Sequence, residues 1–92
     1  MELNDQMPSV DDLPEEMVIT FRKLLTLGEI SYDQIVLREP TALQVTQWDK
    51  LSGVEADIVA VSIVSGIPKP AVEKLPIRDL IKASRFIASF LG

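Results

Sequence analysis

The stretch that decides the fold is Leu37-Arg38-Glu39-Pro40-Thr41-Ala42, where an apolar alternating segment meets a proline and then a helix start. Pro40 has no backbone N–H and restricts the preceding residue to extended geometry. Thr41 and Gln44 have the spacing of a capping box, in which each side chain accepts a hydrogen bond from the other residue's backbone N–H. The stretch therefore predicts a strand that ends before Pro40 and a helix that begins at Ala42.

Two segments before this junction have the pattern of β-strands. In residues 17–25 apolar positions alternate and β-branched and aromatic types are enriched, and residues 31–38 are similar. Gly28 and Glu29 lie between the two segments and suit a turn. We therefore expect a β-hairpin. Because two strands alone are marginally stable in water, the hairpin must pack on helices or pair an edge with another chain.

The first helix after the junction is expected over residues 42–51, ending before Ser52-Gly53. Helical spacing places three large apolar residues on its buried side: Leu43, Trp48 and Leu51. Trp48 is the only tryptophan of the chain. Its position one turn before Leu51 favours packing in the core over an exposed binding anchor, and both interpretations stay open.

A second helix is expected between Ser52 and Gly66. Ser52 and Glu55 have capping-box spacing, and Gly66 suits a left-handed stop. The apolar stripe of this helix contains Val54, Ile58 and Val61, and either Val64 or Ser65 completes it. Other faces are apolar too, so the helix should be buried on several sides or contact a partner.

Two prolines open the remaining helical segments. Pro70 suits the start of a short helix of one or two turns through Glu73 or Lys74, and Pro76 suits the start of a helix that continues to Leu91. The last helix carries a stripe of Ile77, Leu80, Ile81, Ser84, Ile87, Ala88 and Leu91, widened by Ala83, Phe86 and Phe90. Core packing and partner binding are equally good interpretations for Phe86, Ile87, Phe90 and Leu91.

Composition excludes most enzymatic chemistry. The 92 residues include neither cysteine nor histidine, so the chain lacks thiolate nucleophiles, thiolate metal ligands and the usual general base. It contains no phosphate-binding loop or metal-binding motif. We therefore expect no enzyme activity, no cofactor and no metal site. The longest apolar run, residues 56–67, is shorter than the ~20 residues that cross a bilayer, so we expect no membrane segment.

The first sixteen residues differ from the rest of the chain. They contain no base and six acids: Glu2, Asp5, Asp11, Asp12, Glu15 and Glu16. This composition predicts a disordered acidic tail over 1–16 that does not bind nucleic acid. The remaining length suits one domain. We expect a single α+β domain over 17–92, with an N-terminal β-hairpin followed by a small bundle of three to four helices.

The chain resembles the tail assembly chaperone family of tailed bacteriophages and prophages, the small E-type proteins that serve the tape measure protein. The resemblance covers roughly residues 17–92. Four features in order carry it: the junction at 37–42, the helix with Trp48 and Leu51, the segment Ile67-Pro68-Lys69-Pro70-Ala71-Val72-Glu73-Lys74-Leu75, and the ending from Ile77-Arg78-Asp79-Leu80 through Phe86 to Phe90-Leu91.

The resemblance implies a binding protein. Such a protein binds the long helical tape measure protein in the host cytoplasm, is displaced when the tail tube polymerises, and is not expected in the mature virion. Contact with tail tube protein and a longer frameshifted product sharing the front of the chain are also implied. The candidate contacts in this chain are Trp48, Lys74, Arg78, Lys82, Phe86, Ile87, Phe90 and Leu91. A weak homo-oligomer is compatible with free hairpin edges.

The main alternative is a small DNA-binding regulator with a helix-turn-helix. Residues 72–86 divide into two short helices around Leu75-Pro76, with a basic ridge of Lys74, Arg78, Lys82 and Arg85. The net charge of −5 and the lack of aromatic or Asn/Gln residues that read bases weigh against nucleic acid as a partner. On the chaperone hypothesis the ridge meets acidic positions of the tape measure protein.

Overall fold

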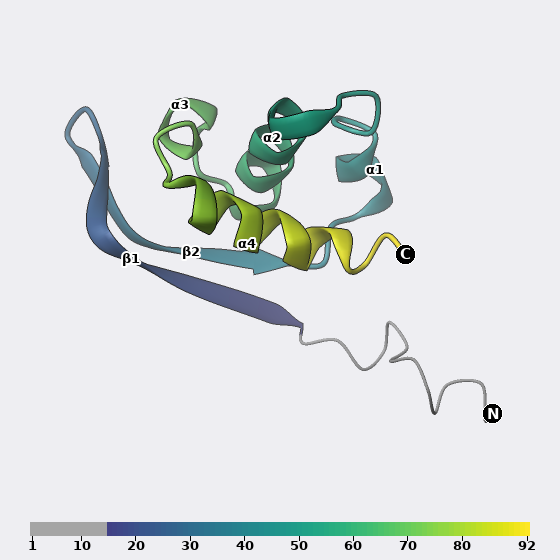
Figure 1. Cartoon of the computed structure of the whole chain (residues 1–92), viewed down its shortest axis with the longest axis horizontal. Coiled ribbons are helices and arrows are strands. Elements are labelled where there is room, and N and C mark those ends of the chain that lie inside the picture. The colour runs from purple at the N-terminus through teal and green to yellow at the C-terminus, as the bar shows by residue number, and fades with distance from the viewer. Residues whose placement is uncertain (1–14) are drawn as a thin grey trace.

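The hairpin predicted from the sequence is present. The computed structural model describes residues 15–92, which form two strands and four helices (Figure 1). β1 (Glu16–Leu27) pairs antiparallel with β2 (Ile30–Arg38), so both strands are longer than predicted. Gly28 has φ 62°, a left-handed conformation that glycine adopts without steric cost, and it closes the turn between the strands.

Four helices follow the hairpin and cover one of its faces (Figure 1). They are α1 (Ala42–Val45), α2 (Gly53–Ser65), α3 (Lys69–Val72) and α4 (Ile77–Ala88). α4 contacts both strands and packs against α2, which also contacts β2. The largest fully buried side chains come from both layers: Ile35, Leu37, Val61, Val72 and Ile87. The α+β class, with a hairpin followed by a small group of helices, is confirmed.

A large bulge in β1 bends the hairpin. The regular pairs on either side of it are Thr20 with Gln34 and Leu25 with Tyr32. Residues 21–24 therefore lie opposite Asp33 alone. Extra residues on one strand bend it and increase its twist. The hairpin tip turns toward α3 (Figure 1), and the Nζ of Lys74 donates to the backbone oxygen of Thr26 at 3.2 Å, which ties the tip to the turn after α3.

The junction between β2 and α1 forms as predicted. Thr41 is the N-cap of α1 and is extended, with φ −83° and ψ 162°. Its Oγ1 accepts a hydrogen bond from the backbone N–H of Gln44 at 3.1 Å. The Oε1 of Gln44 accepts one from the backbone N–H of Thr41 at 2.9 Å. Both bonds of the capping box are therefore confirmed.

Replacing Thr41 by alanine should lower the free energy of unfolding by about 1 kcal/mol, because a backbone N–H in the first turn of α1 loses its acceptor. Urea denaturation followed by circular dichroism would measure the loss. Thr41→Ser keeps the hydroxyl and should remain close to the parent protein. Equal losses in the two variants would mean that the methyl group, and not the cap, is responsible.

The first helix is shorter than predicted. α1 ends at Val45, and residues 46–51 continue in turns that include hydrogen bonds between residues three apart. Thr46 donates from Oγ1 to the backbone oxygen of Leu43 at 2.6 Å, which competes with the helical bonding pattern. The side chains thereby leave the predicted helical face. The prediction that Leu43 and Leu51 are buried is wrong, since both are exposed.

The C-terminal end of α2 forms as predicted, whereas the N-terminal end does not. Gly66 has φ 80° and donates its N–H to the oxygen of Ser62, which confirms the left-handed stop. Ser52 is the N-cap, but its side chain makes no capping hydrogen bond. The carboxylate of Glu55 instead accepts from the Nζ of Lys69 at 2.9 Å, and this hydrogen bond and its charge raise the pKa of Lys69. The predicted capping box at Ser52 is therefore wrong.

α4 is also shorter than predicted, whereas α3 is a single turn, the shorter of the two predicted lengths. α4 ends at Ala88, and the hydroxyl of Ser89 donates to the backbone oxygen of Phe86 just beyond the helix end. The buried residues of α4 are Leu80, Ala83, Phe86 and Ile87. Two residues of the predicted apolar stripe are exposed: Ile77 is the first residue of the helix, and Leu91, for which core and partner contact were both open, lies past its end.

Most of the acidic tail predicted over 1–16 lies outside the described residues, which begin at Glu15. Glu16 is already part of β1. Its carboxylate pairs with the guanidinium of Arg38 across the hairpin, with 2.9 Å between oxygen and nitrogen. The ordered strand therefore begins one residue before the predicted start of the domain at residue 17.

Candidate functional site

A groove of about 830 Å³ lies between the bulged strand and the last helix. One wall is β1 from Val18 to Thr26. The other wall is the turn Lys74-Leu75-Pro76 together with Arg78, Asp79 and Lys82 of α4. The two walls are far apart in the sequence. The groove therefore exists only because the fold brings the N-terminal strand beside the C-terminal helix.

The groove is strongly basic. It is lined by five of the nine basic residues of the chain, namely Arg22, Lys23, Lys74, Arg78 and Lys82. Asp79 is the single acid among the described residues that line it. Five bases and one acid give the lining a formal charge of +4, on a protein whose net charge is −5. Such separation of charge favours association with an anionic partner.

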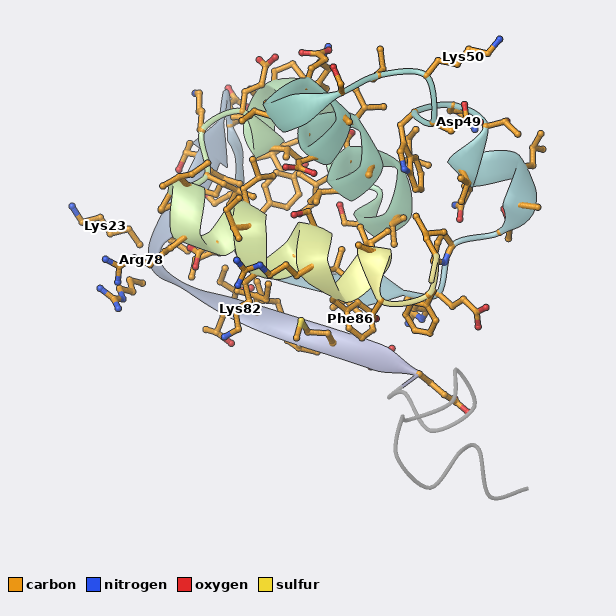
Figure 2. The ribbon with its side chains drawn as sticks, turned by 45° about the vertical axis from the view of Figure 1, so that its right-hand side comes forward. Lys23, Asp49, Lys50, Arg78, Lys82 and Phe86 are labelled. Atoms are coloured by element: carbon orange, nitrogen blue, oxygen red, sulfur yellow. The ribbon has the colours of Figure 1, made fainter. Side chains whose placement is uncertain are left out.

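The basic side chains of the groove are open to solvent and to a partner. Ion pairs within residues 15–92 lie elsewhere, between Arg38 and Glu16 and between Lys69 and Glu55. Figure 2 shows Lys23 and Arg78 extending outward at the same end of the molecule, with Lys50 at the opposite end. The five groove cations are exposed, so their charge is available to an incoming anion.

The apolar candidate residues divide between core and surface. Trp48, Phe86 and Ile87 are buried, and Phe86 is only 7% exposed. Phe90 is half-buried and meets Phe86 edge to face, with 5.2 Å between the ring centroids. Leu91 is 52% exposed. Trp48, Phe86 and Ile87 therefore belong to the core. The apolar surface that remains open to a partner consists of Leu91 and the exposed side of Phe90.

The fold brings the three basic candidates together with two residues that sequence reasoning missed. Lys74, Arg78 and Lys82 form one wall, and Arg22 and Lys23 face them from the bulge of β1. A signal for the bulge was present in the sequence, because two consecutive polar residues are followed by two consecutive apolar ones there. That pattern breaks the alternation of a regular strand. The missing information was which helix the bulge would face.

Residues 15–92 contain no metal-binding cluster, no membrane-spanning helix and no complete helix-turn-helix. In the part of the chain from 15 to 92, carboxylates do not gather in groups of three that could hold a metal ion. No helix in this part is long and apolar enough to cross a membrane. The helix-turn-helix alternative gains no support, because α3 has only four residues and does not supply the first helix of such a motif.

Comparison with known proteins gives the same family as the sequence resemblance. A family model matches residues 19–92, and its description reads "Phage tail assembly chaperone proteins, E, or 41 or 14". That range contains α1 to α4, β2 and most of β1. No curated protein and no solved structure matches the chain. Because the match covers the folded domain and not a single motif, the chain belongs to the family of phage tail assembly chaperone proteins.

Proposed function

We propose that this chain binds the tape measure protein during tail assembly and keeps it soluble until the tail tube polymerises around it. The observation that carries the proposal is the family match over residues 19–92. A long helical protein that exposes apolar stripes aggregates unless they are covered. A small domain present in many copies can cover such stripes one segment at a time.

The surface of the domain supports this role. Its large exposed apolar residues are Val18, Leu24, Ile30, Leu43, Leu51, Val54, Ile77 and Leu91. Covering about 400 Å² of apolar surface contributes roughly 10 kcal/mol, much of which is offset by lost motion and side-chain ordering. The remaining affinity is moderate. A chaperone that the tail tube displaces needs a complex of that reversible kind.

The proposal also places the chain in the assembly sequence. It acts in the host bacterial cytoplasm, contacts tail tube protein while being displaced, and is absent from the mature virion. Two separate surfaces serve these contacts: the basic groove lies beside the start of α4, and Leu91 lies past the other end of this helix. Two partners could therefore be held at once without competing for one surface.

Co-expression with the tape measure protein of the same genome tests the proposal. Affinity pull-down followed by size exclusion at moderate salt should recover a soluble complex, whereas the tape measure protein expressed alone should be insoluble. An unrelated acidic protein of similar size is the control for non-specific solubilisation. If the tape measure protein remains equally insoluble and the two chains do not co-elute, the proposal fails.

A further inference from the structure

We propose that the basic groove between the β1 bulge and α4 binds an acidic helical segment of its protein partner. This inference rests on the proposed function, because the partner meant is the tape measure protein. It adds the chemistry of the bound segment and assigns Arg22 and Lys23 to the site. Neither residue is part of the ridge that the sequence indicated.

Charge is the first argument. The lining bases outnumber the lining acid by five to one, while the whole protein is acidic at −5. A general attraction to nucleic acid would be opposed by that net charge. A peptide segment of high local negative charge can enter the groove without bringing an extended anionic backbone near the other acids of the protein.

The arrangement of the two walls is the second argument. Arg78 and Lys82 are four residues apart on α4, so they lie one turn apart on the same face. Arg22 and Lys23 stand on the opposite wall. Carboxylates at positions i and i+4 of a partner helix repeat at the same spacing. A helix laid in the groove can therefore direct one row of acids to Arg78 and Lys82, while acids on its other flank face the wall formed by β1.

The bulge itself argues for a helix over an added strand. An extended segment could pair only with a regular strand edge, and β1 is interrupted over residues 21–24. Two of those four residues are basic, which is a common protection against strand addition at an edge. A partner in the groove is therefore bound through side chains and not through backbone pairing with β1.

Apolar residues in the groove complete the match to an amphipathic helix. Leu24 is 64% exposed and lines the groove beside the basic residues. Phe21 and Leu75 also line it and are half-buried. Helices that dock in grooves place an apolar face on such residues and polar groups at the rim. The groove thus combines apolar and basic side chains in one lining.

The test uses a synthetic helical peptide with glutamate at every fourth position and leucine on one face. Titration into the purified full-length chain, followed by heteronuclear NMR, should shift resonances of the groove and give an affinity that weakens as salt shortens the screening length. A peptide with glutamine in place of glutamate is the matched ligand control and should bind much more weakly.

Charge reversal locates the binding. Arg22→Glu with Lys23→Glu, and separately Arg78→Glu with Lys82→Glu, should each weaken peptide binding by about tenfold or more. Each pair is exposed, so both variants should fold. Lys50→Glu carries the same type of change at the far end of the molecule and should leave the affinity unchanged (Figure 2).

Three outcomes would overturn the inference. One is equal weakening by Lys50→Glu, which would indicate a net-charge effect. Another is tighter binding of a DNA duplex than of the peptide at the same salt concentration. The third is that the full-length chain binds the peptide only after the acids of residues 1–16 are replaced by amides. That result would mean that the chain's own N-terminal segment is the ligand of the groove. Because this assay contains no tape measure protein, its failure leaves the co-expression result standing.

Discussion

Replacing Phe86 by alanine should lower the free energy of unfolding by about 3–5 kcal/mol. Phe86 is 7% exposed on the buried face of α4 and forms an edge-to-face pair with Phe90. The substitution removes buried apolar surface, leaves a cavity and breaks the aromatic pair. Because small domains are stable by only about 5–15 kcal/mol, this loss should shift the urea midpoint strongly. Fluorescence of the single tryptophan, Trp48, would follow the transition.

Two further variants separate a core role from a contact role. Leu91→Ala alters a side chain that is 52% exposed and should change stability by no more than about 0.5 kcal/mol. Phe86→Leu keeps most of the volume and should cost less than about 1.5 kcal/mol. A Phe86→Ala protein as stable as the parent that no longer binds the tape measure protein would move Phe86 from the core to the interface.

Replacing Trp48 by alanine should also cost about 3–5 kcal/mol. Trp48 is 6% exposed and belongs to the hydrophobic core, although it lies in the turns that follow α1. Its indole ring is the main buried side chain of that segment, and its loss should detach the turns from the hydrophobic core. Circular dichroism during thermal and urea unfolding would measure the effect, since the fluorescent group is absent from the variant.

The control for Trp48 comes from the same segment. Leu43 is 74% exposed on α1, so Leu43→Ala should change stability by less than about 0.5 kcal/mol. Trp48→Phe should fall between Trp48→Ala and the parent protein. If Trp48→Ala were harmless to folding and abolished partner binding, Trp48 would be a binding anchor, which was the other interpretation of its position.

The predictions that succeeded concern features in which a few neighbouring residues determine the backbone. Pro40 and the pair Thr41 and Gln44 specify where β2 ends and α1 begins, through a restricted φ and two hydrogen bonds. Gly28 and Gly66 mark a turn and a helix end by adopting positive φ. These steric restrictions and hydrogen bonds act between residues only a few positions apart. The sequence pattern therefore reveals them without knowledge of the rest of the fold.

The predictions that failed concern which side chains find partners far along the chain. Glu55 has capping-box spacing to Ser52, yet it pairs with Lys69 because α3 comes close to the start of α2. Leu43 and Leu51 have helical apolar spacing, yet the turns after α1 expose them. Spacing shows that a residue can face a core. It does not show whether another element covers that face.

The candidate site divides in the same way. Of the basic ridge recognised from spacing, Lys74, Arg78 and Lys82 line the groove and Arg85 does not. Arg22 and Lys23 join these residues only through the bend of the hairpin. The sequence by itself determined the hairpin turn at Gly28, the junction at Pro40 and the end of α2 at Gly66, because local sterics and hydrogen bonds encode them. The order of its motifs also carried the family resemblance. Tertiary structure alone decided which apolar residues are buried and which charges share the groove, because burial and long-range electrostatics depend on which elements pack together.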